Sequence, residues 1–250
     1  RKRADLYEES AKVLLHQWEI EYKKMALALD DVDLRAKQAM LRRIAFRMQA
    51  NEGGLKGNII HRDDLETELS TYLKSREVPN SLKVAGQLIE QLRKRDFILC
   101  HVGNDYFAFV HRTFLEYFCA TEFAERFGKR GAEGGLTLEQ LQTEVFGAHW
   151  RDKSWHEVLR LIIGNEKVDP EFAEAIVEYL IDLESEDDSA NSLLLAADCY
   201  AEISSKTKKT AVAKALLSKL KEAVETNQQP QAITEKIITL WKDRADVKTW

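Results

Sequence analysis

Apolar residues recur at steps of three and four along most of the chain, which is the spacing of amphipathic helices. The first such stretch covers 4–29. A second follows an acidic turn ending at Asp33, a residue type that commonly caps helices, and it aligns Leu41 and Ile44 on one face. These two stretches predict a helical segment over residues 1–50.

The next part of the chain, 51–130, alternates helical and extended patterns. A glycine-containing loop leads into a short extended piece at 59–61. A helix is then expected to start at Asp63 or Asp64, and another is opened by Pro79-Asn80-Ser81.

A β-hairpin is predicted directly after these helices. Apolar residues dominate 97–102 and 106–110, and the intervening Gly103-Asn104-Asp105 is a turn-forming trio. Helices followed by a β-hairpin make a winged helix-turn-helix, and we predict this domain over residues 51–130.

The stretch 106–120 changes from strand to helix at a single histidine. Phe107, Phe109 and His111 share one side of a period-two pattern, whereas Phe114 and later apolar residues recur at helical spacing. A titratable ring at such a corner is either a hydrogen-bonded core histidine or reserved for a ligand. The residues alone leave both interpretations of His111 open.

A glycine-rich break follows Phe127, and beyond it the sequence predicts only helices, in a separate domain over 136–250. Paired helices of this size are typical of a HEAT-like α-solenoid. Helix starts are expected at Thr137, at a capping box in Ser154-Trp155-His156-Glu157 and at Asp169-Pro170-Glu171, and further helices at 191–204, 208–226 and 231–242. Trp150, Trp155 and Trp241 are expected to be packing residues. The predicted fold class is therefore mainly α, with one β-hairpin.

Composition narrows the class of protein. Charged residues make up 32% and hydrophobic residues 44% of the chain, which suits a core-forming protein. No apolar run approaches the roughly 20 residues that cross a bilayer, and the start lacks the apolar core of a secretory signal. The three cysteines lie in apolar patterns, as expected for buried thiols in a reducing cytoplasm. The chain does not begin with methionine, which suggests a piece of a longer polypeptide.

Catalytic and metal-binding motifs are missing from the sequence. The glycine-rich stretch around Gly57 lacks the Gly-Lys-Ser/Thr of a Walker A loop. The six histidines do not cluster, and there is no Cys-x-x-Cys pair. We therefore predict no enzymatic activity, no metal site and no cofactor held by this chain alone.

The segment around His111 resembles the end of the winged-helix domain of NACHT-family STAND NTPases. Their signature reads roughly Phe-x-His-x-(Ser/Thr)-(Phe/Leu)-(Gln/Leu)-Glu-(Tyr/Phe)-Phe-x-Ala. The matching residues are Phe109, His111, Thr113, Phe114, Glu116, Tyr117, Phe118 and Ala120. A weaker similarity links Arg3, Leu6, Tyr7, Leu14, Leu15 and Trp18 to the stretch that leads into this domain from the NTPase core.

The resemblance implies a nucleotide-dependent switch in a defence or innate-immune protein. In the family the histidine contacts the phosphates of bound ADP in the closed resting state, so this cofactor-binding role falls on His111. The implied partners are the NTPase core of the same polypeptide, which binds ADP or ATP with Mg²⁺, and a protein or other trigger at the C-terminal helices. Activation implies a homo-oligomer. Glu116 is expected to form a salt bridge within its own domain.

Two alternatives remain open at this point. A winged-helix regulator of nucleic acid is favoured by Lys83, Arg93, Lys94 and Arg95, because a recognition helix needs phosphate contacts. The short acidic wing and the net charge of −5 argue against it. The other alternative is a helical scaffold that binds protein partners through its C-terminal helices.

Overall fold

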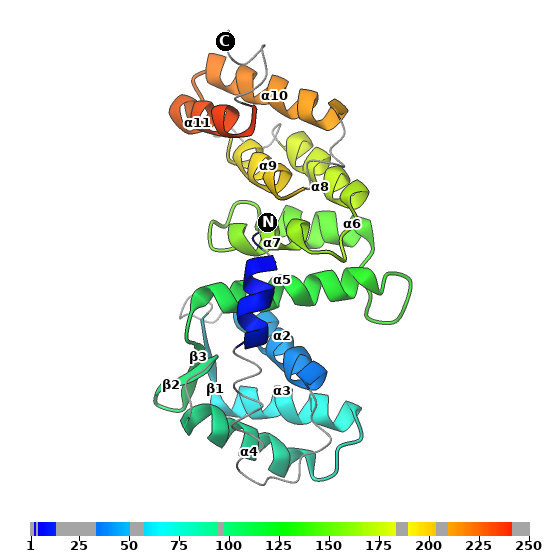
Figure 1. The fold of residues 1–250 in the computed structure, drawn as a ribbon, viewed down its shortest axis with the longest axis vertical. Coiled ribbons are helices and arrows are strands. Elements are labelled where there is room, and N and C mark those ends of the chain that lie inside the picture. Colours follow the sequence, from blue (N-terminus) through cyan, green and yellow to red (C-terminus); the bar gives the residue numbers. More distant parts are fainter. Residues whose placement is uncertain are drawn as a thin grey trace. The chain divides into compact units, whose positions relative to one another are not determined.

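A computed structural model of the chain describes residues 3, 5–13, 34–50, 58–94, 98–183, 190–203 and 210–241 (Figure 1). The chain divides into two compact units, 1–122 and 123–250. Residues 5–13 are helical, and the rest of the helix predicted over 4–29 lies outside the described residues. Within the described part of the chain, no helix is both long and apolar enough to cross a membrane.

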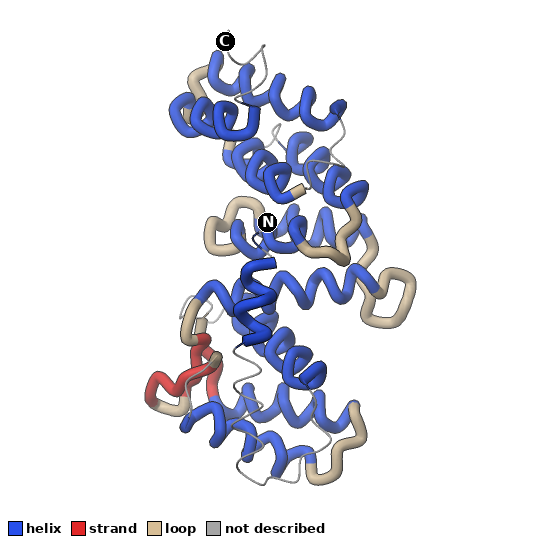
Figure 2. The backbone as a smooth tube through the Cα atoms, viewed as in Figure 1, coloured by secondary structure: helices blue, strands red, loops and turns tan. Residues whose placement is uncertain are grey.

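The first unit has the element order of a winged helix-turn-helix, as predicted. Its elements are α2 (Leu34–Ala50), β1 (Ile59–His61), α3 (Arg62–Ser75), α4 (Ser81–Lys94), β2 (Leu99–Gly103), β3 (Tyr106–Phe109) and the first part of α5 (Arg112–Gly128). The strands lie together, with β1 adjoining α3 and β2 adjoining α4 (Figure 2).

The sheet has three antiparallel strands in the order β1-β3-β2, so the predicted hairpin gains a third strand. In the central strand, Phe107 pairs with Ile60 on one side and with His101 on the other. Phe107, Ala108 and Phe109 are all buried, so both faces of this strand are covered. The extended character of 59–61 was predicted, but its pairing partner carried no local signal.

The start of α3 differs from the prediction. The helix begins at Arg62, and its N-cap is His61, whose Nδ1 accepts a hydrogen bond from the backbone N–H of Asp63 at 3.3 Å. His61 is also the last residue of β1, so the strand passes directly into the helix. Asp63 and Asp64 lie instead in the first turn, where the helix dipole favours carboxylates.

The wing turn places two non-glycine residues in the left-handed region. Asn104 and Asp105 have φ angles of 48° and 59°. Two-residue turns with positive φ at both positions match the twist of antiparallel hairpins. The Asp105 carbonyl accepts a hydrogen bond from the Arg62 N–H at 2.8 Å, which ties the wing to the start of α3.

Every secondary-structure element in the described residues of the second unit is a helix. After the end of α5 come α6 (Leu138–Gln140), the π-helical segment η1 (Leu141–Gly147), α7 (His156–Gly164), α8 (Pro170–Asp182), α9 (Asn191–Glu202), α10 (Thr210–Glu225) and α11 (Pro230–Trp241). Helices α7, α9 and α11 adjoin one another in one row, and η1, α8 and α10 form a second row. This two-layer stack of helical pairs agrees with the predicted α-helical domain (Figure 1).

Of two helix starts predicted in this unit, the structure bears out one and contradicts the other. The helix start predicted at Thr137 is confirmed, and the structure adds that Thr137 forms a capping box with Gln140. The capping box predicted at Ser154 is wrong, because α7 starts at His156 and its N-cap, Trp155, makes no side-chain hydrogen bond. The Ser154 N–H donates instead to Asp152 Oδ1 at 2.8 Å, within the preceding turn.

The helix that follows Thr137 widens into the π-helical η1, which the sequence did not predict. A Cβ on Gly147 would lie 2.5 Å from the Tyr179 hydroxyl oxygen, so the Tyr179 side chain of α8 occupies space that only a glycine at 147 leaves open. Gln142 Nε2 also donates to the Ala175 carbonyl at 3.0 Å. Contacts with α8 therefore accompany the change in helix type.

Charged side chains connect the row formed by α7, α9 and α11. Arg160 contacts Glu202 at 3.2 Å and Glu157 at 3.5 Å. Lys236 Nζ lies 2.7 Å from Asp198 Oδ1. These ion pairs bind each helix of the row to its neighbour.

Replacing Arg160 with methionine is expected to destabilise the second unit by about 2 kcal/mol, because Glu202 then keeps a buried carboxylate without this partner. Urea unfolding would measure the loss. Arg160→Lys retains the charge and should recover part of the stability. In the Glu202→Gln background, Arg160→Met should cost clearly less, and equal costs in both backgrounds would contradict this account.

Candidate functional site

His111 lies between β3 and α5, immediately before the first residue of α5, and its side chain is exposed. Its carbonyl accepts a hydrogen bond from the Phe114 N–H at 3.0 Å, which opens the helix. On its other side, the Val110 N–H donates to the Ile98 carbonyl at 2.9 Å. The backbone is therefore held on both sides of a surface ring, and the core-histidine interpretation does not fit.

Buried aromatic side chains pack beneath the surface at the junction of β3 and α5, where His111 lies. Phe109 and Phe118 are each 2% exposed, and their ring centroids lie 6.0 Å apart. The rings of His111 and Phe114 are 6.2 Å apart. The buried rings fix the start of α5 against the sheet, so the core sets the backbone position from which the His111 imidazole extends.

Arg112 and Glu116 form an ion pair one helical turn apart, with Nε and Oε1 separated by 2.8 Å. The Glu116 side chain is 11% exposed and that of Arg112 is 40% exposed. The expectation that Glu116 forms a salt bridge within its own domain is confirmed. The first turn of α5 carries no acidic residue, so no carboxylate there neutralises the positive end of the helix dipole, which favours anions.

Helix α4 occupies the position of a recognition helix, where the nucleic-acid alternative places its phosphate contacts. Lys83 is exposed, whereas the side chains of Arg93 and Lys94 lie outside those described. Glu90 on the same helix pairs with Arg62 of α3 at 3.1 Å. The described surface of α4 therefore combines a lysine with a carboxylate, and no observation on it favours binding to a phosphate backbone.

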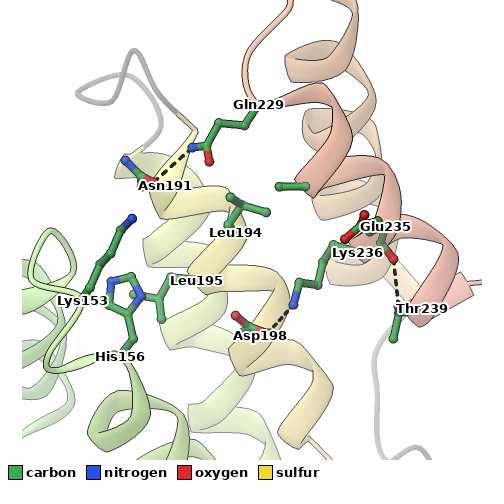
Figure 3. Close-up of a pocket in the computed structure, with 11 residues that line it drawn as sticks. Lys153, His156, Asn191, Leu194, Leu195, Asp198, Gln229, Glu235, Lys236 and Thr239 are labelled. Atoms are coloured by element: carbon green, nitrogen blue, oxygen red, sulfur yellow. Dashed lines mark hydrogen bonds and ion pairs between the residues drawn. The ribbon is translucent and has the colours of Figure 1, made fainter.

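A groove of about 390 Å³ opens along α7, α9 and α11 in the second unit. Figure 3 shows Lys153 and His156 beside the start of α7, Asn191 and Asp198 on α9, and Lys236 on α11. Between these polar groups, Leu194, Leu195 and Ala232 add apolar surface to the lining. Such a surface can bind a partner through both charged and apolar contacts.

Two contacts across the groove join α9 to α11 and to the residue just before α11 (Figure 3). Lys236 pairs with Asp198, and Gln229 Nε2 donates to Asn191 Oδ1 at 3.1 Å. At the other edge, His156 Nε2 lies 2.7 Å from the carbonyl oxygen of Trp150. Because a carbonyl only accepts, Nε2 is the donor there, and this bond fixes the imidazole ring.

The loop before α7 holds a stacked aromatic pair. The rings of His149 and Trp155 are parallel, with centroids 3.7 Å apart. Burial lowers the pKa of His149, and the nearby Asp152 carboxylate opposes this only in part. Burial also acts to raise the pKa of Asp152, but hydrogen bonds from Ser154 and the neighbouring histidines outweigh it and lower that pKa.

The second unit is expected to lose stability as the pH falls below about 6.5, the ordinary pKa of histidine. In the folded state the pKa of His149 is lower, so in this window the unfolded chain binds more protons and acid favours unfolding. The stability is fully present above pH 6.5. Urea midpoints at pH 7.5 and 5.5 measure the change, which His149→Gln should reduce. An unaltered pH dependence in that variant would rule out His149 as its source.

Sequence reasoning selected His111 as a candidate site residue but none of the groove residues. Asn191 and Asp198 are seven residues apart on α9, a spacing that places them on one helix face, so a partial signal existed. Their proximity to Lys153 and Lys236 depends on helix packing that periodicity does not reveal. Among the described residues, no cluster of three or more histidine, cysteine, aspartate or glutamate side chains could hold a metal ion.

The first unit is thus a winged helix-turn-helix, and a helical unit follows it in the chain. Residues 3–123 match the family model of the winged helix-turn-helix domain C-terminal to NACHT. This part of the chain belongs to that family, as the signature around His111 predicted. No curated protein and no solved structure matches the chain significantly.

Proposed function

We propose that the chain is the regulatory and sensor part of a NACHT-type signal-transduction NTPase, in which the winged helix closes over ADP in the resting state. The family match over residues 3–123 supports the class of protein. The exposed His111 at the start of α5 carries the proposed contact, because a surface imidazole on a fixed backbone can meet a ligand held by another module.

In this proposal the His111 ring donates a hydrogen bond to a phosphate oxygen of ADP bound to the NTPase core. A hydrogen bond to a charged group contributes roughly 1.5–3 kcal/mol. This is sufficient to shift an equilibrium between two domain arrangements by about tenfold to hundredfold. The positive end of α5 adds to the attraction, since helix N-termini favour phosphate.

The helical unit is the proposed sensor, and the groove along α7, α9 and α11 is its proposed contact surface for a trigger. Its polar groups of both signs suit a protein or another polar ligand. Trigger binding then favours the ATP–Mg²⁺ state of the core and assembly of a homo-oligomer. A cytoplasmic role in antiviral defence or innate immunity fits this scheme, in which the chain contributes binding and the core contributes ATP hydrolysis.

Hydrogen–deuterium exchange on the full-length polypeptide tests the proposed closure. Amides in peptides spanning 106–120 should exchange more slowly with ADP than without nucleotide, because the corner is then covered. Peptides from α9, on the groove, serve as the internal comparison and should change little. Identical exchange of 106–120 in both states would refute closure over ADP.

A further inference from the structure

We propose that Arg112 is a second phosphate-binding residue at the start of α5 and that Glu116 is the positioning residue that orients it. This inference rests on the proposed nucleotide contact of His111. Arg112 follows His111 directly, and its side chain is 40% exposed. The corner therefore carries two nitrogen-bearing side chains at successive positions, and both reach solvent.

The ion pair with Glu116 fixes one edge of the Arg112 guanidinium. The contact is made through Nε, at 2.8 Å from Glu116 Oε1. A guanidinium is planar and carries its other N–H groups on two terminal nitrogens, so binding at Nε also sets the direction of those groups. Arginine recognises phosphate through two parallel N–H groups, which makes this orientation relevant to binding.

Burial makes Glu116 an anchor for Arg112. The residue is 8% exposed and follows Leu115, which is fully buried. A buried carboxylate is costly without a partner, so the Arg112 contact is retained when an anion approaches. An exposed carboxylate would compete with phosphate for Arg112, whereas this buried one holds the guanidinium in place.

The affinity of the full-length polypeptide for ADP, measured by isothermal titration calorimetry, tests the inference. Arg112→Gln should weaken binding at least tenfold, and Arg112→Lys, which keeps the charge without the planar fork, should fall between it and the wild type. Glu116→Gln should weaken binding about threefold to tenfold by releasing Arg112, with no further loss in the Arg112→Gln background. Arg62→Gln is the matched control, because it removes another arginine–glutamate pair in the same unit, one whose arginine has similar exposure.

The outcomes separate this inference from the proposed function. Weaker binding in His111→Ala with unchanged binding in both Arg112 variants would overturn the role of Arg112 and leave the His111 contact standing. Tighter binding in Glu116→Gln would show competition, which also overturns the inference. No effect of His111→Ala would instead remove the proposed function. Urea unfolding identifies any variant that fails to fold. If Glu116→Gln fails, the comparison of Arg112→Gln with Arg112→Lys tests the inference by itself.

Discussion

The full-length polypeptide carrying His111→Ala is expected to bind ADP about tenfold to hundredfold more weakly than the wild type, through loss of a hydrogen bond to a charged phosphate. The fold should be unaffected, because the ring is exposed and the corner is held by backbone hydrogen bonds at Val110 and Phe114. Calorimetric titration with ADP measures the affinity, and urea unfolding checks the stability.

Two further variants serve as controls for the His111→Ala result. His111→Gln keeps a neutral N–H donor and should retain part of the affinity. His61→Asn changes another partly exposed histidine of the same unit while keeping a residue type that caps helices, so ADP binding should be unchanged. Wild-type affinity in His111→Ala, with the fold intact, would refute the proposed contact between His111 and the ADP phosphates.

The same His111→Ala variant should also respond without a trigger. If the histidine stabilises the closed state, its loss shifts the two-state equilibrium towards the open arrangement by the same free energy. Size-exclusion chromatography with ATP and Mg²⁺ should then show more of the assembled species than for the wild type. A purely monomeric variant under conditions that assemble the triggered wild type would contradict this coupling.

Trp155→Ala is expected to destabilise the second unit by about 3–5 kcal/mol, the cost of deleting a large buried aromatic side chain. Trp155 is 4% exposed, stacks on His149 and lies 6.1 Å from the ring of Phe123. This loss is a large part of the roughly 5–15 kcal/mol that stabilises a typical domain. Urea unfolding followed by circular dichroism measures it.

Trp155→Phe provides the comparison, since it keeps an aromatic ring against His149 and should lose less stability than Trp155→Ala. The alanine variant should also show a weaker dependence on pH between 5.5 and 7.5, because His149 becomes more hydrated and its pKa returns towards 6.5. A loss below about 1 kcal/mol in Trp155→Ala would show that the loop contributes little to the unit.

Helix positions could be predicted because periodicity is local. Helices α9, α10 and α11 begin and end within two residues of their predicted bounds. The structure differs from these patterns where contacts outside the helix itself decide the outcome, either far along the chain or in the preceding turn. Strand β1 needs β3 as its partner, η1 forms where Gly147 meets Tyr179, and the Ser154 signal is overridden by Asp152.

The two candidate sites, the corner at His111 and the groove in the second unit, differ in whether local sequence reveals them. His111 could be found because its neighbours in sequence form a recognisable pattern, and the Arg112–Glu116 pair lies within one helical turn. The groove combines residues from 153 to 239, whose proximity depends on how three helices pack. A site made of residues close in sequence can be predicted from one sequence, whereas a site assembled by helix packing cannot.

The distribution of thiols allows the two units to be followed separately. Cys119 in the first unit and Cys199 in the second are fully buried, and burial raises the pKa of Cys199 well above its usual range. The thiolate is the form that attacks alkylating reagents, so each of these cysteines becomes reactive only when its surroundings open. Mass spectrometry of alkylated peptides can thus record which half of the molecule opens first, with no engineered label in either half.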